Sequence, residues 1–211
     1  MPSIPTAVFD FDGTLANSMA VGLDVYNVIA RRSGFPTLDQ TGFQTIRQLS
    51  VPEILSYLGV PRWRLPCFIL QGRRLMHRRS AEIQPYPGVR DLINRLLEND
   101  IRVAVLTANS RAIVQQFFQR HEMKMPDFVD STRWRKGKHQ FLREREKENR
   151  RLIYVTDEAR DIVLAQRASV PVVAVDWGFN TRERLLKARP DRLVSDTEQL
   201  NTAIIELLKP E

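Results

Sequence analysis

Strand and helix signals alternate along most of this chain, and that alternation constrains the fold more than any other feature. Short apolar runs typical of buried strands are separated by amphipathic segments typical of helices. The expected strands are 6–9, 101–106, 128–129, 152–155, 170–175 and 192–194, and the expected helices after residue 88 are 89–99, 112–120, 138–149, 162–168, 182–188 and 197–208. Such alternation implies right-handed crossovers and a parallel sheet. The pattern therefore predicts an α/β fold whose ligand binds at the carboxyl ends of the strands.

The segment that follows the first strand has a different pattern. It carries no strand signal of any strength, and its apolar spacing predicts helices over 17–32, 43–58 and 67–79. The turn cluster Pro85-Tyr86-Pro87-Gly88 then returns the chain to the alternating pattern. We therefore expect an α/β core formed by residues 1–16 and 85–211, with an all-helical insertion over residues 17–84.

Two carboxylates, Asp10 and Asp12, directly follow the first strand, and Gly13 and Thr14 come next. Side chains two apart on a strand share a face, so these carboxylates should leave the strand together. They would repel each other unless a cation lay between them, and Mg²⁺ takes carboxylate oxygens while keeping positions open for phosphate. Gly13 permits a positive φ or a close approach of the backbone to a ligand. The competing interpretation is an Asx-rich turn that caps the next helix.

Two further polar clusters also stand at strand ends. Strand 101–106 ends in Thr107-Ala108-Asn109. There the Thr107 hydroxyl can donate to a phosphoryl oxygen, and the amides that open the next helix favour an anion. Strand 152–155 is followed by Asp157 and Asp161, which would share a face on the first turn of a helix.

A lysine pair lies between these two clusters. Lys136 and Lys138 flank Gly137 just before an expected polar helix. A lysine at this point could neutralise the carboxylates and hold the group that is transferred. Gly137 gives the backbone freedom to approach the site at Lys138, so the local sequence favours Lys138 over Lys136.

The string Val8-Phe9-Asp10-Phe11-Asp12-Gly13-Thr14-Leu15 and the three later clusters, taken in order, resemble the four motifs of the haloacid dehalogenase (HAD) superfamily of phosphohydrolases. The resemblance spans essentially the whole chain and implies a Rossmann-like core. The stretch Val175–Asn180 and the later Arg189-Pro190-Asp191 look like the end of phosphoglycolate phosphatase-like members. The helical insertion lies where such members carry a C1 cap domain.

The resemblance also implies roles. Asp10 would be the nucleophile that forms an aspartyl-phosphate, and Asp12 the general acid and then the base that activates water. Phosphate would be bound by Thr107, Ala108 and Asn109 of the second motif and by Lys138, the lysine of the third motif. Mg²⁺ would be the cofactor, and the expected metal-site residues are Asp10, Asp12 through its backbone carbonyl, Asp157 and Asp161, the last orienting either a metal-bound water or the lysine. One departure is Thr156, where family members usually have glycine; a positive φ there would strain a threonine.

Charge is unevenly distributed along the chain. The formal net charge is +7, and residues 17–84 contain nine arginines, no lysine and four acids, which is +5 of that total. This excess of positive charge suggests an anionic partner, and the resemblance implies that the partner is a small anionic, phosphorylated substrate. A solvated face of scattered arginines is the alternative. A nucleic-acid-binding or regulatory role is disfavoured, because of the arginine pairs only Arg62 and Arg64 have an aromatic residue between them, Trp63.

The sequence thus predicts a cytoplasmic, Mg²⁺-dependent phosphatase acting on a small monoester such as phosphoglycolate. No apolar run has the length of a membrane span, the first residues do not resemble a signal peptide, and the single cysteine, Cys67, excludes an internal disulfide. Asp12 argues against a dehalogenase, because dehalogenases lack an acid at that position. A phosphomutase or another HAD phosphotransferase stays open as an alternative, and the oligomeric state is not determined by the sequence.

Overall fold

The computed structural model describes residues 4–131, 137–148 and 151–209, and the chain divides into two compact units. One unit comprises Met1–Asn17 and Gln84–Glu211, and the other comprises Ser18–Ile83. Two short strands, β2 (Ala16–Asn17) and β3 (Gln84–Pro85), pair antiparallel at the chain positions where the first unit is interrupted. None of the described helices is long and apolar enough to cross a bilayer.

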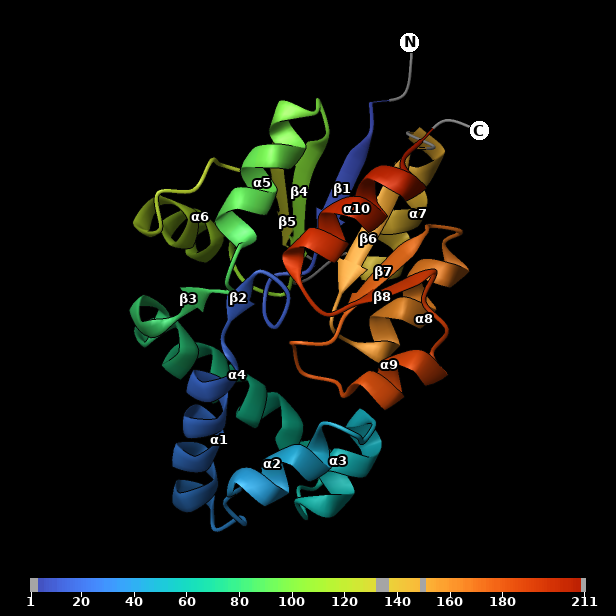
Figure 1. The fold of residues 1–211 in the computed structure, drawn as a ribbon. Coiled ribbons are helices and arrows are strands. Elements are labelled where there is room, and N and C mark those ends of the chain that lie inside the picture. Colours follow the sequence, from blue (N-terminus) through green and yellow to red (C-terminus); the bar gives the residue numbers. More distant parts are fainter. Residues whose placement is uncertain (1–3, 132–136, 149–150, 210–211) are drawn as a thin grey trace. The chain divides into compact units, whose positions relative to one another are not determined.

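The first unit is built on a parallel sheet of six strands in the order β5-β4-β1-β6-β7-β8 (Figure 1). The strands are β1 (Thr6–Phe9), β4 (Arg102–Thr107), β5 (Phe128–Ser131), β6 (Leu152–Thr156), β7 (Val172–Val175) and β8 (Arg192–Val194). Every neighbouring pair is parallel, which confirms the α/β expectation. Because β1 lies between β4 and β6, the polar segments that follow these three strands meet at one edge of the sheet.

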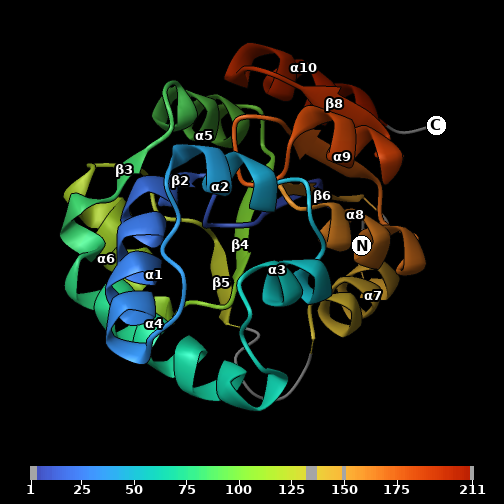
Figure 2. The same ribbon diagram turned by 90° about the horizontal axis from the view of Figure 1, so that it is seen from below.

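Helices cover both faces of this sheet (Figures 1 and 2). They are α5 (Val89–Glu98), α6 (Arg111–Arg120), α7 (Lys138–Glu148), α8 (Ala159–Arg167), α9 (Arg182–Lys187) and α10 (Thr197–Leu207). On one face, Leu142 of α7 and Ile162 of α8 pack with Val8, Leu106 and Tyr154 in a buried apolar cluster. On the other face, α5 and α10 contact each other and the strands β4, β7 and β8. Side chains alternate between the two faces of the sheet along each strand. The residues of β1 and β6 that lie on the same face as Val8 therefore point toward α7 and α8.

The second unit, all of whose residues are described, contains only helices as regular elements: α1 (Met19–Ser33), α2 (Gln40–Ile46), α3 (Val51–Tyr57), η1 (Arg62–Arg64), α4 (Leu65–Arg78) and η2 (Ser80–Glu82). The expectation of one helix over 43–58 is wrong. A new helix begins after Ser50, whose backbone N–H donates to Glu53 Oε2 (2.6 Å), and Pro52 lies in its first turn. A capping box and an early proline both favour a helix start, so the segment forms two short helices.

Candidate active site

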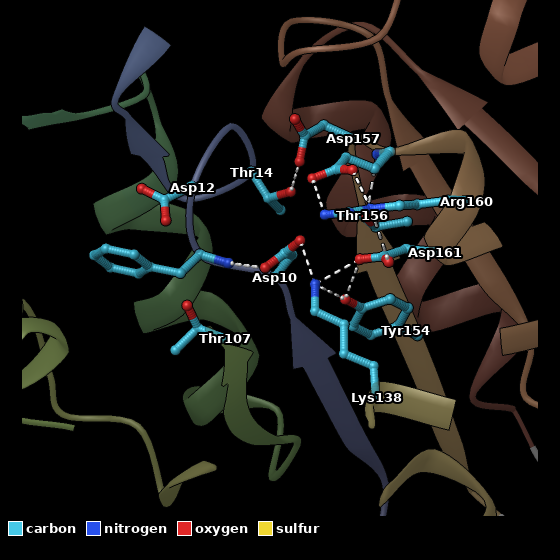
Figure 3. A network of polar contacts seen from close by, with 12 residues as sticks. Asp10, Asp12, Thr14, Thr107, Lys138, Tyr154, Thr156, Asp157, Arg160 and Asp161 are labelled. Atoms are coloured by element: carbon cyan, nitrogen blue, oxygen red, sulfur yellow. Dashed lines mark hydrogen bonds and ion pairs between the residues drawn. The ribbon is translucent and has the colours of Figure 1, made fainter. Parts of the chain in front are cut away.

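Asp10 follows the central strand β1 and is almost completely buried, with 6% of its surface exposed. Its Oδ1 accepts a hydrogen bond from the Phe11 N–H (2.8 Å), and its Oδ2 accepts one from Lys138 Nζ (2.6 Å) (Figure 3). Burial raises the pKa of Asp10 well above its ordinary value; Lys138 opposes this shift, and the charges of Asp161 and Asp157 add to it. The ionised form of Asp10 therefore depends on positive charge held beside it.

Lys138 supplies one such charge from the first position of α7. Besides Asp10, its Nζ donates to the Tyr154 hydroxyl (3.0 Å) and to Asp161 Oδ2 (Figure 3). Burial alone would lower the pKa of Lys138, but the neighbouring Asp10, Tyr154 and Asp161 raise it well above its ordinary value. The amine is therefore protonated at neutral pH. The alternative lysine, Lys136, lies outside the described residues.

Tyr154 is a member of this cluster that the sequence did not reveal. It is fully buried on β6, and its hydroxyl donates to Asp161 Oδ2 (3.2 Å) while accepting from Lys138 Nζ. An aromatic residue in an apolar strand is typical of a core position, so only the three-dimensional structure brings out the hydroxyl contacts.

Asp157 and Asp161 do not share a face, contrary to expectation. The helix α8 begins at Ala159, so Asp157 precedes it and only Asp161 lies in its first turn. Asp161 contacts Lys138, whereas Asp157 accepts hydrogen bonds from the Thr14 hydroxyl (2.8 Å) and the Phe179 N–H (2.7 Å). Burial, and then the charge of the adjacent Glu158, raise the pKa of Asp157 to about 7.

The loop after β7 encloses Asp157. The Asn180 N–H donates to the Asp157 carbonyl (3.2 Å), and Asn180 Oδ1 accepts from the N–H of Ala159 (2.8 Å). A Cβ added to Gly178 would lie 2.2 Å from the Asp157 Cβ, and one added to Gly13, whose φ is +77°, would lie 2.0 Å from Asp157 Oδ2. In the sequence, only the family resemblance drew attention to this loop. Its contacts with Asp157 appear only in the structure.

The concern that threonine at position 156 would be strained is not borne out. Thr156 is the last residue of β6, and it is not among the described non-glycine residues that have a positive φ. Its hydroxyl accepts a hydrogen bond from the Glu158 N–H (3.2 Å) and so helps to shape the turn into α8. The backbone at this position needs no glycine.

Asp12 lies on a different side of the site from Asp10. Strand β1 ends at Phe9, and the Phe11 carbonyl then accepts from the N–H groups of three later residues, which turns the chain before β2. As a result the Asp12 side chain points away from Asp10 (Figure 3), and its Oδ2 accepts a hydrogen bond from Asn109 Nδ2. The expectation that both carboxylates would leave the strand together is therefore wrong.

The predicted phosphate-binding segment Thr107–Asn109 begins at the last residue of β4 and leads toward α6. Thr107 is 1% exposed and its Oγ1 accepts from the Asn109 N–H (3.1 Å), while Ala108 is exposed. The following helix α6 is capped by Ser110, whose side chain accepts from the Ile113 N–H. Backbone amides at such a helix start favour an anion.

The carboxylates of Asp10 and Asp157 suit a hard divalent cation. Burial raises the pKa of both groups; the charge of Asp157 adds to the shift at Asp10, and the charge of Glu158 adds to the shift at Asp157. Oxygen donors of this kind match the preference of Mg²⁺. Among the described residues, however, no three acidic, histidine or cysteine side chains are grouped in a way that could hold a metal. The residues therefore fit a site with two carboxylates.

Comparison with known proteins identifies the family. The model of the haloacid dehalogenase-like hydrolases matches residues 7–175. The chain belongs to this family. It is also 28% identical over 207 residues to a phosphoglycolate phosphatase of Synechococcus elongatus, covering 96% of this chain and 98% of that protein.

Solved structures of HAD proteins share this fold. A predicted phosphatase from Clostridium acetobutylicum superposes with a TM-score of 0.81 at 17% identity, covering 98% of this chain and all of the other. CbbY from Rhodobacter sphaeroides, solved with phosphate, gives a TM-score of 0.71 at 21% identity, covering 93% of this chain and 96% of the other. These likenesses confirm the expected Rossmann-like core, and the family model with the full-length relative shows that the chain is a HAD-type hydrolase.

Proposed function

We propose that this HAD hydrolase is a Mg²⁺-dependent phosphatase that cleaves a small phosphate monoester through an aspartyl-phosphate on Asp10. The observation that carries the proposal is the buried bridge in which one lysine, Lys138, contacts both Asp10 and Asp161. A carboxylate whose pKa is raised and that lies beside a charged lysine is typical of a nucleophile in phosphoryl transfer.

The reaction has two steps. In the first, an Asp10 oxygen attacks phosphorus, the bond from phosphorus to the leaving oxygen breaks, and Asp12 gives that oxygen a proton. In the second, Asp12 takes a proton from a water molecule whose oxygen attacks phosphorus. The bond to Asp10 then breaks, which releases inorganic phosphate and restores the carboxylate.

Both steps need positioning and charge neutralisation more than covalent chemistry. Lys138 neutralises Asp10 and the transferring group, and Asp161 holds Lys138 in place. The Thr107 hydroxyl and the Ala108 amide hold the phosphoryl oxygens, and the Asn109 N–H supports the Thr107 side chain. Asp10, Asp157 and the Asp12 backbone carbonyl would hold Mg²⁺, which would supply further positive charge beside the phosphate.

For the substrate we propose phosphoglycolate or a similarly small, anionic monoester. The full-length similarity to a phosphatase named for that compound supports the choice. We assign the helical unit Ser18–Ile83, with its +5 charge, as a cap domain that selects the substrate. The single cysteine suits a reducing compartment, and we propose the cytoplasm.

Release of inorganic phosphate from a panel of phosphorylated metabolites tests this function. With Mg²⁺ we expect turnover of phosphoglycolate, and with EDTA we expect none until Mg²⁺ is restored. A phosphomutase would isomerise a sugar phosphate without releasing phosphate. If no metabolite and no aryl phosphate is hydrolysed, the proposal is wrong.

A further inference from the structure

Asn109 is held at three points by residues from three different segments. Its backbone N–H donates to Thr107 Oγ1 (3.1 Å), and its carbonyl accepts from the Ser131 hydroxyl (2.7 Å). Its side-chain Nδ2 donates to Asp12 Oδ2, 97 residues away in the chain. Thr107 ends β4 and Ser131 ends β5, so two neighbouring strands fix the backbone of the residue that reaches Asp12.

This arrangement determines how the Asp12 carboxylate is presented. An amide NH₂ group can only donate, so Asp12 Oδ2 acts as an acceptor in this contact. The contact therefore fixes the orientation of the Asp12 carboxylate. Because both backbone groups of Asn109 are already bonded, its side chain holds Asp12 with little further loss of conformational freedom.

We propose that Asn109 is a positioning residue for Asp12: it orients this carboxylate for proton exchange with the leaving oxygen, and Ser131 supports Asn109 through its backbone carbonyl. The inference rests on the proposed function, in which Asp12 is the general acid. It adds a role that phosphate binding by the Thr107–Asn109 segment does not include.

The consequence is a specific dependence on the leaving group. Expulsion of a strongly basic alkoxide needs a proton in the transition state, whereas expulsion of a weakly basic nitrophenolate does not. Loss of the Asn109 side chain should therefore harm poor leaving groups much more than good ones. A purely structural role, or a role in holding phosphate, would harm all of them alike.

The experiment measures kcat/KM for phenyl phosphates of increasing leaving-group basicity, from p-nitrophenyl phosphate to phenyl phosphate, and for phosphoglycolate. The ratio kcat/KM reports on the steps up to formation of the aspartyl-phosphate. For Asn109→Ala we expect a loss of about 10–100-fold with phosphoglycolate, part of the usual effect of a general acid, and a loss of less than about threefold with p-nitrophenyl phosphate. Ser131→Ala should shift the profile in the same direction by a smaller amount.

Two further variants separate positioning from structure. Ser110→Ala removes the neighbouring helix cap and should lower the melting temperature while leaving the leaving-group profile unchanged. In an Asp12→Asn background, Asn109→Ala should not make the dependence of kcat/KM on leaving-group basicity any steeper, because the Asp12 carboxyl group through which Asn109 acts is gone.

Equal losses across the series for Asn109→Ala would overturn the proposal, as would a steeper profile that persists in the Asp12→Asn background. These results leave the phosphatase assignment standing, because the wild-type protein still hydrolyses the series. Absence of hydrolysis by the wild-type protein instead overturns the phosphatase assignment and the positioning role together.

Discussion

Replacing Lys138 by methionine should damage stability and catalysis together. The Lys138 side chain is only 13% exposed, and its amine lies 2.6 Å from Asp10 Oδ2 and also contacts Asp161 Oδ2. Methionine keeps most of the volume but leaves both carboxylates buried without the cation between them. Removing one partner of a buried ion pair costs about 3–5 kcal/mol, so we expect the free energy of unfolding to fall by about 3 kcal/mol at neutral pH without Mg²⁺. Losing a preorganised charge at the phosphoryl group should lower kcat by at least about 10²-fold.

Urea unfolding followed by fluorescence, together with phosphate-release kinetics, measures both effects. We expect the urea midpoint to fall with an unchanged m-value, because the loss is electrostatic and the surface exposed on unfolding is the same. Lys136→Met serves as the matched control and should behave like the wild type. Adding Asp161→Asn to Lys138→Met removes one unpaired carboxylate and should recover more than half of the lost stability but none of the activity. Wild-type stability and kcat in Lys138→Met would refute this reasoning, and loss of activity in Lys136→Met alone would transfer the role to Lys136.

Three further outcomes follow from the site and the helical unit. Tyr154→Phe removes the hydroxyl that bonds Lys138 and Asp161, so kcat should fall about tenfold, the equivalent of one hydrogen bond to a charged group, and normal kcat would contradict this. Gly13→Ala places a methyl group against Asp157 and should raise the Mg²⁺ concentration needed for half-maximal activity, and an unchanged Mg²⁺ titration would argue against Asp157 as a metal ligand. Replacing the exposed Arg74 and Arg78 by glutamine should raise KM for phosphoglycolate, which carries a carboxylate besides its phosphate, more than KM for p-nitrophenyl phosphate, whose organic group is neutral. Equal effects would favour a merely solvated face.

The fold was predictable because its signals are local. Each strand is an apolar run and each following helix has its own periodicity, so the order of elements and the parallel sheet follow from the sequence. The helical unit shows the limit of that method. Apolar spacing continues from Phe43 through Leu58, and the interruption at Ser50 depends on a cap formed with Glu53, which outweighs the periodicity.

The site was predictable in its residue types and less so in its pairings. Strand ends indicated which acidic and hydroxyl groups meet, but not their partners: Asp12 accepts from Asn109, 97 residues away in the chain, and Asp161 accepts from Lys138. The spacing of Asp157 and Asp161 suggested a shared face only on the assumption that the helix includes both, and it begins two residues after Asp157. Tyr154 was missed because a tyrosine in a buried strand has the same sequence signature as any core aromatic residue.

The central claim is that Asp10 carries the phosphoryl group, and chemical trapping tests it most directly. Borohydride reduces an acyl phosphate to an alcohol, so reduction during turnover should convert Asp10 to homoserine in the peptide that contains Thr6–Phe11. We expect that product by mass spectrometry in the wild-type protein with Mg²⁺ and phosphoglycolate or p-nitrophenyl phosphate, and we expect none in Asp10→Asn, which should also be inactive. Reduction at another carboxylate, or sustained turnover by Asp10→Asn, would contradict the account.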